Sequence, residues 1–283
     1  MSCPVCGADA ARPKLRVAKE QIVECERCGL AWWQRPAGAA PPERLYDAAY
    51  FARSEAAHGY DDYAREEPQL RHTFSRRLAR LGRPAPGARL LDVGAAFGFG
   101  VSEARRAGWR AFGIEISRDA ARQASQQAPG RIAVAHALRA PFRDASFAQV
   151  VLWDVLEHLA DPHAAIAEVA RLLAPDGRLA LTTGDVRSLV ARLSGARWHL
   201  YTLPEHLFFY SRESLARLLA DHGLRVQRMR AEGASYSVAY LLERLRKTLL
   251  RRASPGGRAG PVDRLRIPVN LFDIVTVHAV KQP

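Results

Sequence analysis

From about residue 86 to the C-terminus, short apolar runs alternate with longer amphipathic segments. The runs predict strands at 89–93, 111–114, 131–135, 149–152 and 178–183, and a helix at 211–222 precedes further strands at 224–229 and 272–280. Between the runs, apolar side chains recur every three to four positions, as at Ile166, Val169 and Leu172, which predicts helices with one buried face. Two of these helices are predicted to begin at the N-cap residues Ser117 and Asp161. Strands that alternate with helices form a doubly wound α/β sheet. We therefore assign residues 86–283 to one α/β domain.

The residues before this domain divide into two parts. Residues 1–35 hold all the cysteines and are expected to form a small separate unit. Residues 36–85 begin as a Pro/Ala-rich linker and continue as a polar, aromatic segment that we expect to be partly helical. Within the α/β domain, residues 186–222 are expected to cap the substrate side, and residues 236–262 to form an inserted helix and loop.

A glycine-containing turn follows the first strand of the domain, with the sequence Asp92-Val93-Gly94-Ala95-Ala96-Phe97-Gly98. Glycine lets the main chain approach a ligand where a Cβ atom would collide, and the helix after the turn presents N-terminal amides to a carboxylate. A dinucleotide-binding turn requires G-x-G-x-x-G, whose third glycine would fall at position 99, which is phenylalanine. The turn therefore favours a cofactor other than a dinucleotide, with candidate contacts at Asp92, Gly94, Ala96 and Gly98.

Glu115 is predicted to end the second strand, 21 residues after Gly94. An acidic residue at this place in a doubly wound sheet accepts hydrogen bonds from the ribose hydroxyls of a nucleoside cofactor. The alternative interpretation is a solvated charge at the end of a strand. We take Glu115 as a further candidate cofactor contact.

Three segments resemble motifs of class I S-adenosylmethionine-dependent methyltransferases. The turn at 92–98 is similar to their D-x-G-x-G-x-G motif. Trp153-Asp154-Val155-Leu156-Glu157-His158-Leu159 is similar to the V-L-E-H-L motif after strand four of the ubiquinone-type and related small-molecule members. Residues 171–178 resemble the R-x-L-K-P-G-G turn before strand five, and the resemblance covers about residues 88–230.

The resemblance implies a seven-stranded, doubly wound, Rossmann-like methyltransferase sheet, with strand order 3-2-1-4-5-7-6 and an antiparallel last strand. It also implies methyl transfer with S-adenosylmethionine as the cofactor. The implied cofactor contacts are Asp92, Gly94, Ala96, Gly98, Glu115, Ile116, Ala137, Trp153 and Asp154. The sequence departs from the family pattern at Ala96, which replaces a glycine, at 136–138, where the usual acidic residue is missing, and at Ala148, which replaces an aspartate. These departures keep open a non-catalytic scaffold with a degenerate cofactor pocket.

The four cysteines form two CxxC pairs, Cys3 with Cys6 and Cys25 with Cys28, with 18 residues between the pairs. In a cytosolic protein this arrangement favours a metal site over disulfides. Four thiolates at this spacing can surround a tetrahedral Zn²⁺, and a glycine after each pair suits a tight turn. We therefore expect a structural zinc ribbon over residues 1–35; iron in place of zinc and two free thiol pairs are the alternatives.

The segment 198–211 follows strand five and is the stretch of the chain richest in polar and aromatic residues. A similar E-H-L-x-x-F-S run occurs in methyltransferases with an N-terminal zinc ribbon. Because a histidine titrates near neutral pH, we predict that His206 is the general base and that Glu205 orients it. Tyr210 or Tyr201 is predicted to line the acceptor pocket. The alternative is that His206 packs against the sheet and Glu205 stabilises a loop.

The acceptor is expected to be a small molecule or a saccharide. No cysteine remains for a thiol adduct with a nucleic-acid base, and residues 153–156 lack the N-P-P-Y motif of enzymes that methylate amino groups of bases. The net charge of +13 comes mainly from arginines scattered along the chain, without one basic block. Nucleic acid is therefore the less favoured partner, and the alternative function is an rRNA or tRNA methyltransferase that contacts RNA through its ribbon.

The predicted helix at 238–252 has one apolar face and several basic residues elsewhere. It is expected to act as a lid or packing helix; the alternative is that it rests on an anionic membrane or covers a lipid-linked acceptor. The chain begins without an apolar secretory segment, and its apolar runs are too short to cross a bilayer. We therefore expect a cytoplasmic protein without a transmembrane segment, and the sequence predicts no oligomeric state.

Overall fold

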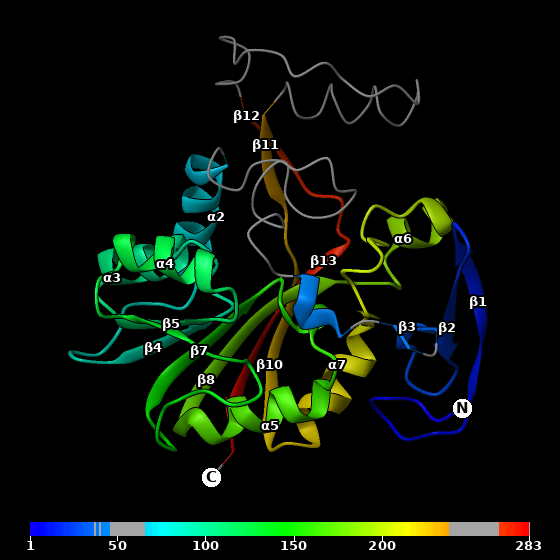
Figure 1. Cartoon of the computed structure of the whole chain (residues 1–283), viewed down its shortest axis with the longest axis horizontal. Helices are drawn as coiled ribbons and strands as arrows, with labels where there is room; N and C mark the ends of the chain where they lie inside the picture. Colours follow the sequence, from blue (N-terminus) through cyan, green and yellow to red (C-terminus); the bar gives the residue numbers. More distant parts are fainter. Residues whose placement is uncertain (37, 40, 46–65, 238–265, 283) are drawn as a thin grey trace.

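Figure 1 shows the computed structural model, which describes residues 1–36, 38–39, 41–45, 66–237 and 266–282. A large twisted sheet forms the centre, helices cover its two faces, and a smaller sheet near the N-terminus lies at one side. The predicted helix at 238–252, the loop at 254–261 and most of the aromatic segment before residue 66 lie outside the described residues.

The large sheet contains seven strands in the order β10-β13-β8-β7-β4-β5-β6. Their bounds are β4 Arg89–Val93, β5 Arg110–Glu115, β6 Ile132–Val134, β7 Phe147–Trp153, β8 Leu173–Gly184, β10 Leu224–Ala231 and β13 Ile274–Lys281. Neighbours from β6 to β8 pair in parallel, whereas β13 runs antiparallel between β8 and β10. Numbered within the sheet, this is the order 3-2-1-4-5-7-6 with an antiparallel last strand, so the predicted fold class is confirmed.

Alternate side chains of each strand point to opposite faces of the sheet, and each face has its own helices. In β7, Val150 and Leu152 belong to one apolar cluster, and Val151 belongs to the other. The first cluster includes residues of α5 (Pro162–Leu172) and α7 (Arg212–Ala220), and the second includes residues of α2 (Glu67–Ala79), α3 (Phe99–Arg106) and α4 (Arg118–Gln127). No helix among the described residues has both the length and the apolar character needed to cross a membrane.

Side-chain caps mark where α4, α5 and α7 begin. The Ser117 side chain accepts a hydrogen bond from the main-chain N–H three residues on, at the start of α4, and Asp161 does the same for α5. Ser211 and Ser214 form a reciprocal capping box at the start of α7. Such side-chain oxygens satisfy N–H groups that have no partner within the helix. The helix starts predicted at Ser117 and Asp161 are confirmed.

The N-terminal residues belong to a four-stranded sheet with the order β1-β2-β3-β9. Its first three strands, β1 (Ala11–Val17), β2 (Glu20–Cys25) and β3 (Ala31–Trp33), come from the expected ribbon. The fourth strand, β9 (Phe208–Phe209), comes from the segment expected to cap the substrate side, and it pairs antiparallel with β3. Main-chain pairing therefore joins the ribbon to the α/β domain, which the sequence analysis did not predict.

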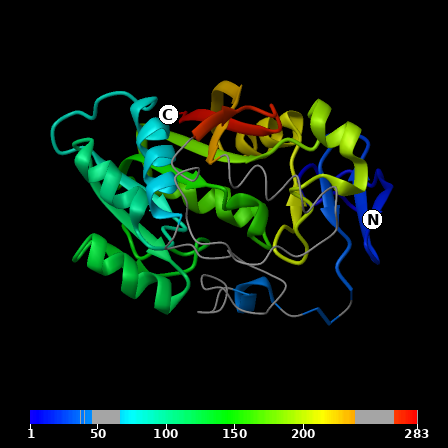
Figure 2. The ribbon, with the colours of Figure 1, turned by 90° about the horizontal axis from the view of Figure 1, so that it is seen from above.

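The ribbon also shares its apolar core with the large sheet. Val5, Val23 and Leu30 belong to the same buried cluster as the residues of α5 and α7. Figure 2 shows the ribbon from above, next to α6 (Leu189–Ser194). Because a unit of this size buries too little apolar surface to be stable alone, the shared core contributes to holding the ribbon in place. A separate two-stranded sheet forms from β11 (Ala234–Ser237) and β12 (Arg266–Val269).

Replacing Asp161 with alanine should lower the free energy of unfolding by about 1 kcal/mol, because the first turn of α5 loses its cap. The Asp161 carboxylate accepts from the N–H of Ala164 at 2.9 Å. Urea unfolding of Asp161→Ala measures the loss, and Asp161→Asn is the matched control because asparagine caps a helix about as well. Equal losses in both variants would show that the charge, and not the cap, matters here.

Candidate active site

The carboxyl ends of the parallel strands meet at one edge of the large sheet, where ligands of doubly wound folds bind. The turn at 94–98 leaves β4, Glu115 ends β5 and Asp154 follows β7. The strand order reverses at β4, which lies between β5 and β7. These predicted cofactor contacts therefore lie on neighbouring strands, at the place where this fold class binds nucleosides.

The turn after β4 combines exposed main chain with a strained alanine. Gly94 is exposed, with a φ of +75°, and a Cβ atom there would lie 2.7 Å from Val155. Gly98 has a φ of +78°, and a Cβ atom there would lie 3.0 Å from Ala124. Ala96 adopts a φ of +45°, in the left-handed region that favours glycine. The turn therefore keeps the path of a glycine turn at the cost of strain at Ala96.

Glu115 holds this turn from the neighbouring strand. One carboxylate oxygen accepts a hydrogen bond from the N–H of Ala96 at 2.8 Å, and the other accepts from the N–H of Ser117 at 2.9 Å. Burial raises the pKa of Glu115, although these N–H donors act in the opposite direction. Each carboxylate oxygen has a second lone pair. Glu115 can therefore accept ribose hydroxyls while it holds the turn.

Asp92 lies beneath the turn and is only 3% exposed. Its Oδ2 faces Gly100 in the first turn of α3, where a Cβ atom would come within 2.4 Å of that oxygen. Burial and, secondarily, the charge of Glu115 raise the pKa of Asp92 to about 8. At neutral pH the Asp92 carboxyl is therefore mostly protonated, and it lies in the core against the first turn of α3.

Asp154 is held by groups from two other elements. Its Oδ1 accepts a hydrogen bond from Oγ1 of Thr182 in β8 at 2.8 Å, and its Oδ2 accepts from Nη1 of Arg77 in α2 at 3.0 Å. The residue has a φ of +58°, and its side chain is 44% exposed. Backbone strain of this kind persists where surrounding contacts impose it, and it is frequent at functional sites. Asp154 therefore presents an anchored carboxylate at the carboxyl edge of the sheet.

Arg77 is a site residue that the sequence analysis missed. It is buried, and besides Asp154 it donates from Nε to Glu232 at 3.2 Å. Its guanidinium lies over the ring of Trp153, 5.2 Å from the centroid, in a cation–π contact. Burial alone would lower the pKa of Arg77, but the two carboxylates raise it. No local pattern distinguishes this arginine from the others of α2, so only the tertiary structure identifies it.

His158 and His206 meet edge to face, with ring centroids 4.6 Å apart. His158 lies in a short 3₁₀ helix, η2 (Leu156–His158), and its Nδ1 is 3.0 Å from the carbonyl of Glu205. Nδ1 of His206 is 2.8 Å from the carbonyl of Leu200. Because a carbonyl only accepts, His206 carries its proton on Nδ1 and a lone pair on Nε2. Burial lowers the pKa of His158 to about 3 and of His206 to about 4, so both are neutral at pH 7. The expectation that His206 titrates near neutral pH is therefore wrong, because its ring is buried.

Glu157 completes a cluster with these histidines, because one ligand-type atom from each of the three lies within 4.8 Å of the others. Glu157 is 4% exposed, and its Oε2 has no hydrogen-bond partner among the described residues. Burial and the charge of Asp154 raise the pKa of Glu157 to about 8. At neutral pH the cluster is therefore mostly uncharged and can take up or release a proton.

Other predicted residues of the acceptor side lie farther from solvent or act through their main chain. Tyr210 is fully buried and donates from its hydroxyl to the carbonyl of Leu156 at 3.4 Å. Tyr201 is buried against Phe209, with ring centroids 4.6 Å apart. Glu205 contributes the carbonyl that accepts from His158. The remaining predicted cofactor contacts are partly or fully buried: Ile116, Ala137 and Trp153.

The four cysteines lie together in the ribbon, with their sulfur atoms all within 4.8 Å of one another. Sγ of Cys3 is 3.6 Å from Sγ of Cys28, and Cys6 and Cys25 are separated by the same distance. A tetrahedron with metal–sulfur bonds of about 2.3 Å has an edge of about 3.8 Å. In each CxxC turn, the N–H of the following glycine donates to the carbonyl of the first cysteine. The donor set and its geometry fit a tetrahedral four-thiolate metal site.

A family model described as a methyltransferase domain matches residues 63–228. The chain belongs to the methyltransferase-domain family. This methyltransferase is 28% identical over 198 residues to the ubiquinone biosynthesis O-methyltransferase of Thiobacillus denitrificans, an alignment that covers 65% of this chain and 85% of that protein. It is 31% identical over 170 residues to the protein of the same name from Ralstonia nicotianae, with coverages of 56% and 71%. The chain is thus an S-adenosylmethionine-dependent methyltransferase.

Solved structures share the fold of this methyltransferase. Geranyl diphosphate C-methyltransferase of Streptomyces coelicolor superimposes with a TM-score of 0.53 at 20% identity, covering 83% of this chain and 88% of that one. A putative methyltransferase in complex with the Haloferax volcanii Trm112 activator gives 0.55 at 18% identity, with coverages of 78% and 95%. These likenesses establish the Rossmann-like architecture, and the identities are too low to transfer an activity.

Replacing Ala96 with glycine should stabilise the protein. A left-handed conformation costs an L-residue about 1–2 kcal/mol, and the greater freedom of glycine in the unfolded chain offsets roughly half of this gain. Urea unfolding of Ala96→Gly should therefore show a gain of about 0.5–1 kcal/mol. Ala95→Gly is the control because Ala95 is buried and lies outside the left-handed region, so that variant should lose stability. A loss in both variants would contradict strain at Ala96.

Replacing Glu157 with glutamine should raise stability more at high pH than at low pH. The pKa of Glu157 rises from 4.5 to about 8 on folding. Below pH 4.5 the carboxyl is protonated in both the folded and the unfolded state. Between pH 4.5 and about 8 only the unfolded chain loses the proton, so the free energy of unfolding of the wild type falls as the pH rises. Melting temperatures at pH 5 and pH 9 measure the effect, with the exposed Glu26→Gln as the control. A difference between variant and wild type that stays constant with pH would contradict the burial of an ionisable carboxyl.

Proposed function

We propose that this methyltransferase transfers the methyl group of S-adenosylmethionine to a hydroxyl group of a small molecule, with His206 as the general base. The observation that carries the proposal is the hydrogen bond from Nδ1 of His206 to the carbonyl of Leu200, which leaves a lone pair on Nε2 of a neutral ring. The relatives named as ubiquinone biosynthesis O-methyltransferases support a small molecule with an oxygen acceptor.

Residues at the carboxyl edge of the sheet fit the cofactor. Glu115 is proposed to accept the ribose hydroxyls, and the exposed main chain at Gly94 to contact the methionine part. Asp154, paired with Arg77, presents a half-exposed carboxyl group at the same edge. When bound, S-adenosylmethionine supplies an electrophilic methyl group. The residues proposed to border the rest of the cofactor are Asp92, Ala96, Gly98, Ile116, Ala137 and Trp153.

The acceptor hydroxyl has to lose its proton as its oxygen forms the bond to the methyl carbon. We assign this proton to Nε2 of His206, while Nδ1–H of the same ring keeps donating to the carbonyl of Leu200. The ring then carries a positive charge, which the carboxylate of Asp154 favours. A neutral amine would attack the methyl group before losing any proton. A buried neutral imidazole is therefore better matched to a hydroxyl acceptor.

Two of the predicted acceptor-side residues enter the proposal as supports. The main-chain carbonyl of Glu205 orients the ring of His158, which lies against His206. The hydroxyl of Tyr210 holds the main chain at Leu156, next to Glu157. A saccharide or a lipid-linked compound presents the same hydroxyl chemistry and stays within the proposed acceptor class. RNA is less favoured because the positive charge of the chain is scattered.

We further infer that the ribbon holds Zn²⁺. Four thiolates fill a tetrahedral coordination sphere, so the metal would stabilise the fold and have no open position for catalysis. Thiolate ligands require reduced cysteines, and the four cysteines form no disulfide. This thiol chemistry supports the proposal of a cytoplasmic location, where disulfides are rare.

Replacing His206 with alanine should lower the rate of methyl transfer to phenolic acceptors by about 10²–10⁴-fold, the usual contribution of a positioned base. Transfer from radiolabelled S-adenosylmethionine to a panel of phenols and catechols measures the rate. Calorimetric affinity for S-adenosylhomocysteine should stay at the wild-type value, because His206 lies outside the cofactor turn.

Two variants make this test specific. His72→Ala removes an exposed histidine of α2 and should leave the rate unchanged. Glu115→Gln should weaken S-adenosylhomocysteine binding, since the amide of glutamine accepts at one atom only. A His206→Ala enzyme as fast as the wild type would refute the base, and undiminished affinity in Glu115→Gln would refute the ribose contact.

A further inference from the structure

The main chain next to His206 forms hydrogen bonds with the ribbon on one side and with the cluster of Glu157, His158 and His206 on the other. The N–H of Leu207 donates to the carbonyl of Glu157 at 2.9 Å, and the carbonyl of Leu207 accepts from the N–H of Trp33 at 2.9 Å. Trp33 belongs to β3 of the ribbon, and Glu157 belongs to the cluster. The residue next to the proposed base therefore connects these two parts of the molecule.

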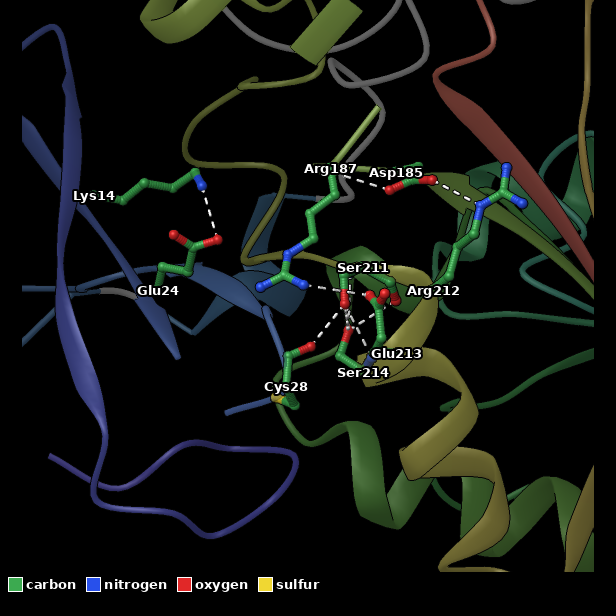
Figure 3. Close-up of polar contacts among 9 residues, drawn as sticks. All are labelled: Lys14, Glu24, Cys28, Asp185, Arg187, Ser211, Arg212, Glu213 and Ser214. Atoms are coloured by element: carbon green, nitrogen blue, oxygen red, sulfur yellow. Dashed lines mark hydrogen bonds and ion pairs between the residues drawn. The ribbon is translucent and has the colours of Figure 1, made fainter. Parts of the chain in front are cut away.

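Ser211 makes a second connection, directly to a cysteine of the metal site. Its buried hydroxyl donates to the carbonyl of Cys28 at 2.7 Å, and Figure 3 shows it between Cys28 and the start of α7. The same hydroxyl accepts from the N–H of Ser214 at 3.0 Å as the helix cap. The position of α7 and of the segment before it is thus tied to the turn that carries Cys28.

Arg187 contacts the same turn at the glycine after Cys28. A Cβ atom at Gly29 would lie 2.4 Å from Cζ of Arg187, so the guanidinium packs directly on the main chain there. In Figure 3 this guanidinium also points to Glu213, with a closest N···O distance of 3.7 Å. The N–H of Arg187 donates to the buried Asp185 at 3.0 Å, where the chain leaves β8. A metal-binding turn that changes shape would lose this packing.

We propose that the metal-loaded ribbon positions His206 against His158, and that Ser211 and Arg187 are the positioning residues that transmit the state of the metal site. The inference rests on the proposed role of His206 as the base. Cys28 offers a metal ligand through its sulfur and the acceptor for Ser211 through its carbonyl. Loss of the metal would free the turn that carries Cys28. The hydrogen bond from Ser211 to Cys28 and the pairing of β3 with β9 would then be lost. Within the described residues, β4 pairs with β5 and β7 only, so none of its strand hydrogen bonds is made to the ribbon.

Hydrogen–deuterium exchange on the full-length protein tests the inference without an acceptor. The samples are the zinc-loaded wild type, the wild type after chelation, and zinc-loaded Ser211→Ala. In the chelated wild type and in Ser211→Ala, the amides of residues 31–33 and 205–210 should exchange about tenfold faster than in the zinc-loaded wild type. The reason is that the hydrogen bonds that join the ribbon to residues 205–210 are lost. Residues 89–97 should exchange at the wild-type rate, and calorimetric affinity for S-adenosylhomocysteine should be unchanged.

Two control variants separate positioning from general destabilisation. Ser214→Ala removes the other half of the capping box but leaves the bond from Ser211 to Cys28. Lys14→Met removes an ion pair with Glu24, 2.9 Å long, between β1 and β2 of the ribbon (Figure 3). Both controls should exchange at the wild-type rate over residues 205–210.

Three results would overturn the inference. They are unchanged exchange over 205–210 after chelation, equal acceleration in Ser214→Ala and Ser211→Ala, or acceleration that extends to 89–97 with loss of S-adenosylhomocysteine binding. The last would mean that the ribbon only stabilises the whole fold. The rate of His206→Ala tests whether His206 is the base, and hydrogen–deuterium exchange tests whether the ribbon positions it. Failure of one proposal can therefore be distinguished from failure of the other.

Discussion

Parallel pairing of β4 with both β5 and β7 is the constraint on which the rest of the site depends. The register sets Asp92 opposite Gly113 on one side and opposite Val151 on the other, so the three strands end at one level. The glycine turn, Glu115 and Asp154 therefore leave the sheet at the same edge. Because the strands end together, these groups can contact neighbouring elements. Glu115 accepts a hydrogen bond from the N–H of Ala96, and Asp154 forms an ion pair with Arg77.

Burial determines the charge state of this edge. Asp92 and Glu157 have pKa values raised to about 8, and His158 and His206 are held neutral. Asp154 lies beside them and pairs with Arg77 at 3.0 Å. The result is two anchored side chains, Glu115 and Asp154, beside an uncharged cluster of Glu157, His158 and His206. Such an arrangement suits cofactor binding on one side and proton transfer on the other.

The ribbon is part of the acceptor side. Pairing of β3 with β9 continues the ribbon sheet into the segment that carries the proposed base, and Ser211 attaches α7 to the turn of Cys28. A small four-thiolate unit has little core of its own, so it gains stability from this contact, and the contacted segment gains a rigid neighbour. The two parts therefore depend on each other for their position, although they are far apart in the chain.

The sequence by itself determined the sheet, its strand order through the family resemblance, the helix caps at Ser117 and Asp161, and the grouping of the cysteines, because periodicity, capping chemistry and ligand spacing are local. It also suggested Glu115 and Asp154, which follow strands. Only the tertiary structure decided that Arg77 is the partner of Asp154, that His158 meets His206, and that the hydroxyl of Tyr210 lies in the core. These contacts join residues tens of positions apart, and their existence depends on how helices and loops pack across the sheet, which no local pattern encodes.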